Sequence, residues 1–184
     1  MKSYAEDIKS FDFLLIDGYN VIYSWPSLIE LANISLEAAR DGLVAMLSNY
    51  QGFKGLNIII VFDAYKIRFG KRNIEIVGNV SVVYTSEFET ADAYIEKVTG
   101  HIIKIAWMYK VAVATGDYTE QVIIMSKGAL RLSPRELLED VELAQKAIRA
   151  KIEKDRAVKN NTLFDNLDEA TAKIFETMRK NKNL

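Results

Sequence analysis

Apolar runs alternate along the chain with segments in which apolar residues recur at helical spacing. The runs are short enough to be buried strands, and a polar turn follows each of the longer ones. The strands expected from these runs lie at 13–16, 57–62, 80–84 and 111–115, with a brief extended piece at 130–132. Because strands and helices alternate, the pattern predicts an α/β fold with a mainly parallel central sheet.

The segments between the strands are expected to be helical, apart from one loop. The helices are predicted at about 27–50, 90–108 and 119–126. Ser35 stands before Leu36 and can cap a helix, and Thr90 is the cap candidate of the second segment. The stretch 64–79 has no helical period and is predicted to be a polar loop with basic and aromatic residues.

The C-terminal part of the chain carries the strongest helix signal. Ser133-Pro134-Arg135-Glu136 forms a capping box with proline at the first helical position. It predicts a helix that begins there and runs to about Val158, where Asn160-Asn161 follows as a break. A second amphipathic helix is expected at about 165–179.

The candidate metal-binding residues lie at the ends of the expected strands. Three of them are followed by an aspartate, namely Asp17, Asp63 and Asp117, and Asp92 lies near the start of the helix after the third strand. The carboxyl ends of parallel strands meet at one edge of a sheet, so these side chains are expected to converge. Each aspartate alone is a common turn residue, but together they would repel one another unless a cation lay between them. Oxygen ligands of this kind suit Mg²⁺ or Mn²⁺, which can activate water for cleavage of a phosphodiester.

Other polar side chains near this edge can support the aspartates. Asn20 follows Asp17 by three residues and can orient it or a water molecule. Thr90 and Thr115 can hydrogen-bond a carboxylate or a phosphate, or simply act as caps, and Glu89 and Glu120 are further acids expected beside the acidic group. The basic residues that can contact phosphates, or simply keep the surface soluble, are Lys66, Arg68, Lys71, Arg72, Arg131 and Arg135.

Composition narrows these possibilities. The chain of 184 residues is 49% hydrophobic, which suits one domain, expected over 1–158 and followed by a helical tail at 159–184. Its net charge is −1, but the charges are unevenly distributed. Residues 1–126 contain 11 Lys and Arg and 15 Asp and Glu, so this part of the chain is acidic. Zero cysteines and one histidine exclude a thiol nucleophile and a zinc site of the usual type. A polar start and no apolar run of about 20 residues predict a cytoplasmic protein without a membrane segment.

Several motifs, in order and spacing, resemble the YacP-like branch of the NYN domain family. They are Leu14-Leu15-Ile16-Asp17-Gly18-Tyr19-Asn20, Val61-Phe62-Asp63-Ala64, Glu89-Thr90-Ala91-Asp92, Ala114-Thr115-Gly116-Asp117-Tyr118-Thr119-Glu120-Gln121 and Gly128-Ala129-Leu130-Arg131 with the capping box after it. This family belongs to the PIN-like nucleases, so the resemblance implies a three-layer α/β/α fold with a C-terminal helical extension. It further implies an acidic metal site and endoribonuclease action on single-stranded RNA, and bacterial members of the branch are associated with ribosomes and with mRNA cleavage.

The resemblance also assigns residues. Asp17, Asp63, Asp92 and Asp117 match the acidic residues of the family, with Asp92 either a ligand or a group that orients water, and Asn20 matches its asparagine. The resulting hypothesis is an endoribonuclease that depends on Mg²⁺ or Mn²⁺ and acts on mRNA, with the ribosome as a further partner. The alternative is a non-catalytic module that binds RNA or the ribosome and retains the acidic pocket.

Overall fold

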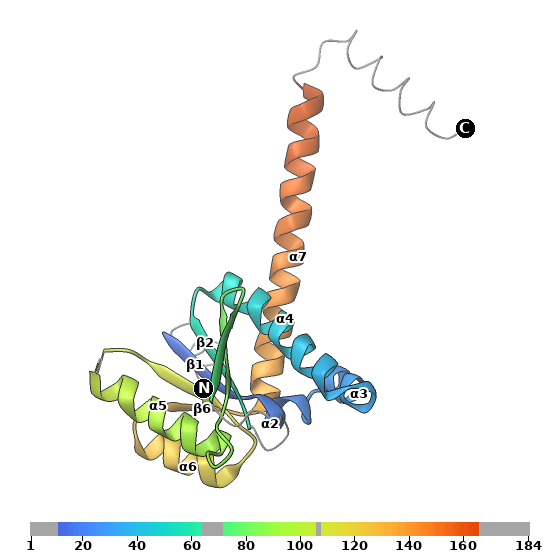
Figure 1. Cartoon of the computed structure of the whole chain (residues 1–184). Coiled ribbons are helices and arrows are strands. Elements are labelled where there is room, and N and C mark those ends of the chain that lie inside the picture. Colours follow the sequence, from blue (N-terminus) through green and yellow to red (C-terminus); the bar gives the residue numbers. More distant parts are fainter. Residues whose placement is uncertain (1–10, 64–71, 106–107, 166–184) are drawn as a thin grey trace. The chain divides into compact units, whose positions relative to one another are not determined.

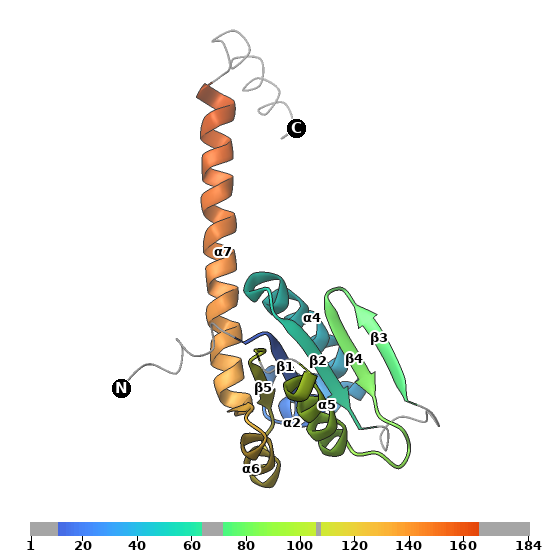
Figure 2. The same ribbon diagram turned by 90° about the vertical axis from the view of Figure 1, so that its left-hand side faces the viewer.

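The computed structural model describes residues 11–63, 72–105 and 108–165. Within these residues six strands form one sheet, in the order β3-β4-β2-β1-β5-β6 (Figure 2). The strands are β1 Phe13–Asp17, β2 Asn57–Phe62, β3 Asn73–Val77, β4 Val80–Tyr84, β5 Val111–Ala114 and β6 Leu130–Leu132. All neighbouring pairs are parallel except β3 and β4, which are antiparallel. The expected α/β fold with a mainly parallel sheet is therefore confirmed.

Helices cover both faces of this sheet (Figure 1). They are α2 Gly18–Ile22, α3 Pro26–Ile34, α4 Leu36–Lys54, α5 Ala91–Ile105, α6 Tyr118–Ser126 and α7 Pro134–Asp165. Successive side chains of a strand point to opposite faces, so Leu14 and Ile16 belong to the core under α3, α4 and the start of α7. Leu15 belongs to the second core, under α5 and α6. The three-layer α/β/α arrangement follows from this alternation.

The first long helical segment of the sequence is two helices in the structure. Ser35 separates α3 from α4 with extended backbone, and its hydroxyl accepts a hydrogen bond from the Ala38 amide at 3.4 Å. In the same way, the Thr90 hydroxyl accepts one from the Ala93 amide at 3.2 Å at the start of α5. Both residues act as the caps that the sequence predicts.

One part of the predicted loop 64–79 is a strand, so that prediction was wrong for residues 73–77. Ile74 and Ile76 alternate with polar Asn73 and Glu75, and β3 pairs with β4 across the two-residue turn Gly78-Asn79. Gly78 has a φ of 61°, which a tight hairpin of this kind requires at its first central position. The sequence pattern did not indicate this strand because the alternation is short and basic residues precede it. Residues 64–71 of the predicted loop lie outside the described part of the chain.

The capping box before α7 forms as predicted. The Glu136 amide donates to the Ser133 hydroxyl at 3.2 Å, and the Ser133 amide donates to the Glu136 carboxylate at 2.7 Å. The helix does not end at Asn160-Asn161 but continues to Asp165, because asparagine in a helix costs only a fraction of 1 kcal/mol, less than about 0.7. The chain divides into two units, 1–145 and 146–184, and the boundary near 158 stays a prediction. The helix predicted over 165–179 lies almost wholly outside the described residues.

Candidate metal centre

Asp17 ends β1 on the face of the sheet that α5 and α6 cover, because it shares that face with Leu15. Its side chain is 5% exposed and caps α2. The Asn20 amide donates to Asp17 Oδ1 at 3.0 Å, and Asn20 Nδ2 donates to Asp17 Oδ2 at 2.6 Å. Both carboxylate oxygens of Asp17 are therefore held by Asn20, which is the orienting role expected for that asparagine.

The turn between β1 and α2 needs glycine at position 18. A Cβ atom on Gly18 would lie 2.2 Å from the ring of Phe62, which is fully buried at the end of β2. Only a residue without a side chain lets the backbone pass this ring and begin α2 at once. Gly18 thus lets α2 begin directly after Asp17, which places Asn20 within hydrogen-bond distance of the Asp17 carboxylate.

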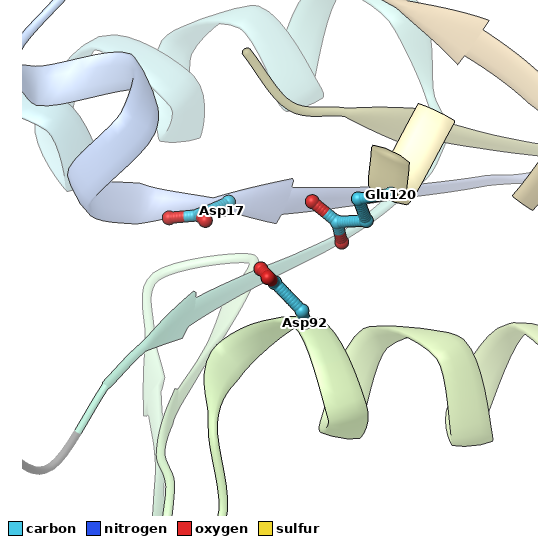
Figure 3. A group of neighbouring side chains, drawn as sticks. All are labelled: Asp17, Asp92 and Glu120. Carbon is cyan, nitrogen blue, oxygen red and sulfur yellow. The ribbon is translucent and has the colours of Figure 1, made fainter. Parts of the chain in front are cut away.

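Two further carboxylates reach Asp17 from the helices of the same face. Asp92 lies in the first turn of α5, and Glu120 lies in the first turn of α6. One carboxylate oxygen of each of the three residues lies within 4.8 Å of those of the other two. Figure 3 shows that the three side chains come from β1, α5 and α6, which are distant in the sequence. The structure therefore brings together Asp17, Asp92 and Glu120.

Glu120 is the most unusual member of this acidic group. It is 4% exposed, and within the described residues neither of its carboxylate oxygens accepts a hydrogen bond of regular geometry. Burial, together with the negative charges of Asp92, Asp17 and Asp117, raises the pKa of Glu120 to about 8, although the nearby Thr115 side chain acts in the opposite direction. Burial also raises the pKa of Asp92, and the charges of Asp17 and Asp117 add to this effect.

These properties fit a bound divalent cation. Carboxylates this close repel one another, and a cation between them would remove that repulsion and give the Glu120 oxygens a partner. An all-oxygen donor set suits the hard cations Mg²⁺ and Mn²⁺ better than zinc or copper. The chemistry of the site thus fits a divalent cation, while its identity stays a prediction.

Asp63 and Asp117 lie beside the acidic group. A pocket of about 320 Å³ is lined by Asp17, Tyr19, Asn20, Asp63, Thr90, Ala91 and Asp92. Asp63 directly follows β2 and is partly buried, whereas Asp117 is exposed and caps α6, where its Oδ1 accepts from the Thr119 amide at 2.7 Å. The charges of both raise the pKa of Asp92, so both act on the site electrostatically. Their predicted roles as ligands stay predictions.

Thr115 and Glu89, both expected beside the acidic group, form hydrogen bonds with other residues. Thr115 is fully buried at the end of β5, and its hydroxyl accepts a hydrogen bond from the Asp117 amide at 3.1 Å. Glu89 accepts hydrogen bonds from Arg72 Nε at 3.0 Å and from Arg72 Nη2 at 2.6 Å. The Thr115 hydroxyl therefore stabilises the turn before α6, and the charge of Glu89 is paired with that of Arg72.

The predicted phosphate contacts are only partly described. Besides its bonds to Glu89, Arg72 lies over the ring of Tyr94, 4.9 Å from its centre. Arg135 Nε donates to Glu139 Oε1 at 3.2 Å on the exposed side of α7, and Arg131 Nη1 donates to Gln121 Oε1 at 3.0 Å. Lys66, Arg68 and Lys71 lie outside the described residues.

Comparisons with known proteins agree with the motifs. The family model of the YacP-like NYN domain matches residues 14–180, which confirms the resemblance. The Uncharacterized protein YacP of Bacillus subtilis (strain 168) is 41% identical over 169 residues, which are 92% of this chain and 97% of that protein. Two crystal structures of Rae1 (YacP) from Bacillus subtilis are similar, each with a TM-score of 0.70. One is 39% identical and covers 92% of this chain and 95% of its own; the other, a tryptophan-to-leucine mutant, is 41% identical and covers 80% and 85%.

No helix in the described part of the chain is long and apolar enough to span a membrane.

Proposed function

The chain belongs to the YacP-like NYN domain family, and we propose that it is a divalent-metal-dependent endoribonuclease that cleaves single-stranded RNA. The observation that carries this proposal is the acidic group of Asp17, Asp92 and Glu120, in which Asp17 and Glu120 are buried and one carboxylate oxygen of each residue lies within 4.8 Å of the others. Within the described residues the Glu120 carboxylate accepts no hydrogen bond of regular geometry, and its burial beside two other carboxylates favours a cation as its partner.

Each residue of the site has a role in this proposal. Asp17, Asp92 and Glu120 would hold the cation, with Asp63 and Asp117 beside them, and Asn20 would keep the Asp17 carboxylate in place through its two hydrogen bonds. When bound, Mg²⁺ or Mn²⁺ supplies Lewis acidity to the phosphodiester and lowers the pKa of a coordinated water molecule. The pocket in front of Asp17 and Asp92 would admit the scissile phosphate.

The choice of mRNA as substrate is a finer part of the proposal. It rests on the resemblance of the motifs to a branch whose bacterial members cleave mRNA at the ribosome. The pocket beside Asp17, of about 320 Å³, gives no reason to expect a particular base sequence. We include the ribosome as a partner and the cytoplasm as the location on the same basis.

A cleavage assay titrated with metal tests the proposal. The purified protein should cleave an unstructured RNA oligonucleotide in Mg²⁺ or Mn²⁺ and should lose this activity when EDTA is added. The Asp17→Asn variant should also be inactive, because it removes a negative ligand from the cation while it keeps the size of the side chain. Its melting temperature in EDTA checks that the variant folds, because the amide relieves carboxylate repulsion but can accept only one of the two hydrogen bonds from Asn20.

The same assay separates the proposal from the alternative of a non-catalytic module. A protein that binds RNA tightly but leaves it intact at every metal concentration, with and without ribosomes, would support the binding module. Full activity of Asp17→Asn would show that the acidic group does not carry the reaction.

A further inference from the structure

Helix α6 has an exposed apolar face on the side away from Glu120. Tyr118, Val122 and Met125 follow one another at helical spacing and are 78%, 50% and 55% exposed. The buried residues of the same helix, Glu120 and Ile124, point to the acidic group and to the core instead. An apolar stripe that the sheet does not cover is thus presented to solvent directly after Asp117.

A cation is held beside this stripe. Gln121 is 8% exposed, and its Nε2 donates to the Thr115 carbonyl at 2.7 Å. Its Oε1 accepts from Nη1 of Arg131, which comes from the edge strand β6. A guanidinium group has five N–H donors, and this bond to Gln121 is the one that the described residues receive from Arg131. The charge of Arg131 also acts on the Glu136 carboxylate, but within the described residues its remaining N–H groups have no hydrogen-bond acceptor and are oriented in advance for an anion.

The stripe and the cation line one hollow. Its volume is about 520 Å³, and its lining residues are Tyr118, Gln121, Val122, Met125 and Arg131. Proteins that bind single strands combine cations for the phosphates with aromatic rings on which bases stack. A protein partner would need a larger apolar surface, whereas one exposed ring with one oriented guanidinium matches the two chemical parts of a nucleotide.

We propose that this hollow is a nucleotide subsite of the single-stranded RNA substrate, in which a base stacks on Tyr118 and an adjacent phosphate binds Arg131. Gln121 is a positioning residue, because it fixes Arg131 through the end of β5. The proposal rests on the proposed function for its choice of RNA. It places the bound strand past the N-terminal end of α6, so that a phosphodiester further along the strand can reach the acidic group that Glu120 helps to form.

RNA binding in Ca²⁺, followed by fluorescence anisotropy, tests the subsite without cleavage, provided that gels show the RNA intact. Tyr118→Ala should weaken binding about tenfold, as the loss of one stacked base does. Tyr118→Phe keeps the ring and should bind within about twofold of the wild type. Arg131→Gln should weaken binding and reduce the slope of log affinity against log salt by about 0.7.

Abasic substitutions sharpen the test. A series of oligonucleotides, each lacking one base, should reveal a position at which the wild type loses affinity and Tyr118→Ala loses no more. Two variants serve as matched controls and should bind like the wild type. Phe53→Ala removes a half-exposed aromatic residue near the end of α4, and Lys97→Gln removes an exposed cation on α5. Melting curves confirm that every variant folds.

The outcomes separate the subsite from the nuclease activity. Loss of binding in Tyr118→Ala together with absence of cleavage by the wild type in Mg²⁺ and Mn²⁺ would support the subsite and overturn the proposed function. Unchanged binding by both Tyr118→Ala and Arg131→Gln would overturn the subsite, even if cleavage is observed. A change of oligomeric state in Tyr118→Ala with unchanged RNA binding would also overturn it and would assign the stripe to a second copy of the chain. A wild type that binds no RNA overturns the subsite as well.

Discussion

Two regions of the domain each bury a carboxylate. In one region the carboxylate has partners within the chain, and in the other it has none of regular geometry among the described residues. Asp140, in the part of α7 that packs on the domain, is 7% exposed and accepts a hydrogen bond from the hydroxyl of Tyr50 on α4. Lys54 Nζ forms an ion pair with the same oxygen, Asp140 Oδ2, at 2.7 Å and also donates to Oδ1 at 3.0 Å. Glu120, at the end of the sheet, is 4% exposed and has no such partner among the described residues.

The difference shows how a structural acid can be told from a functional one. Burial of a carboxylate costs free energy unless hydrogen bonds or cations replace the lost water. Around Asp140 the chain supplies both, and burial together with the Asp140 carboxylate raises the pKa of Tyr50, which keeps the phenol protonated as a donor. Around Glu120 the chain supplies further acids instead, and a divalent cation between these carboxylates would relieve their repulsion, as we propose. The predictions below test this contrast.

Glu120→Gln should have the largest effect on activity of any change in this comparison. Loss of a negative ligand removes several kcal/mol of charge stabilisation, so cleavage of RNA in Mg²⁺ should fall on the order of a thousandfold. Stability in EDTA should not decrease, because the amide has no charge to bury. Cleavage rates and urea unfolding of the same preparation measure both effects. Wild-type activity in this variant would return Glu120 to the supporting role that the sequence predicts.

Asp140→Ala should have the largest effect on stability. It leaves the Lys54 ammonium and the Tyr50 hydroxyl buried without an acceptor, which should cost about 3 kcal/mol of the free energy of unfolding. Activity per folded molecule should stay within about twofold of the wild type. Urea unfolding followed by circular dichroism gives the loss. A triple variant with Tyr50→Phe, Lys54→Met and Asp140→Leu should recover most of it, because no unpaired polar group then remains.

The pH dependence of stability should separate the two carboxylates further. Because the folded-state pKa of Glu120 is about 8 against an ordinary value of 4.5, the folded protein retains a proton that the unfolded chain releases within this window. The free energy of unfolding in EDTA should therefore fall as the pH rises from about 4.5 to 8, by up to about 5 kcal/mol from this group, since each pKa unit corresponds to about 1.4 kcal/mol. Glu120→Gln should flatten the fall, and Mg²⁺ should oppose it by binding the ionised group. An equally steep fall in Glu120→Gln would assign the effect to other residues.

Much of this structure could be predicted from local sequence patterns. The apolar run Asn57–Phe62 coincides with β2, and the aspartate after β1 lies at the acidic edge because all parallel strands end there. The capping box before α7 also forms with the hydrogen bonds that its spacing implies. These features depend on residues within a few positions of one another, or on one general rule of parallel sheets.

The features that the sequence did not predict depend on contacts between distant segments. Tyr50 and Asp140 are 90 positions apart, and their pairing follows from the packing of α7 against α4. The sequence predicts Glu120 beside the acidic group but not as a member of it; it joins Asp17 and Asp92 because α5 and α6 lie together on one face of the sheet. A weak signal was available, since Glu120 lies one turn after Asp117, on the side of α6 that faces the core. The strand β3 was missed because its alternation covers only a few residues among polar neighbours.

Ser133→Ala tests a third, half-buried carboxylate, and its expected effect is the smallest. Burial alone would raise the pKa of Glu136, but hydrogen bonds from the Ser133 hydroxyl and amide lower it below its ordinary value. Loss of the hydroxyl removes one of these bonds and the helix cap, which should cost about 1 kcal/mol at pH 7. A lowered pKa stabilises the fold above the unfolded value and loses its effect as the pH falls, so the cost should shrink toward pH 3.

Denaturant titrations of the wild type and Ser133→Ala at both pH values measure this difference. Ser133→Thr keeps a capping hydroxyl and should lie within about 0.5 kcal/mol of the wild type. A cost that is the same at pH 7 and pH 3 would mean that only the cap contributes, and that the charge of Glu136 adds nothing to the start of α7. Glu136, bonded to a residue three positions away, thus stands between Asp140, which has partners across the fold, and Glu120, for which we propose a cation as the partner.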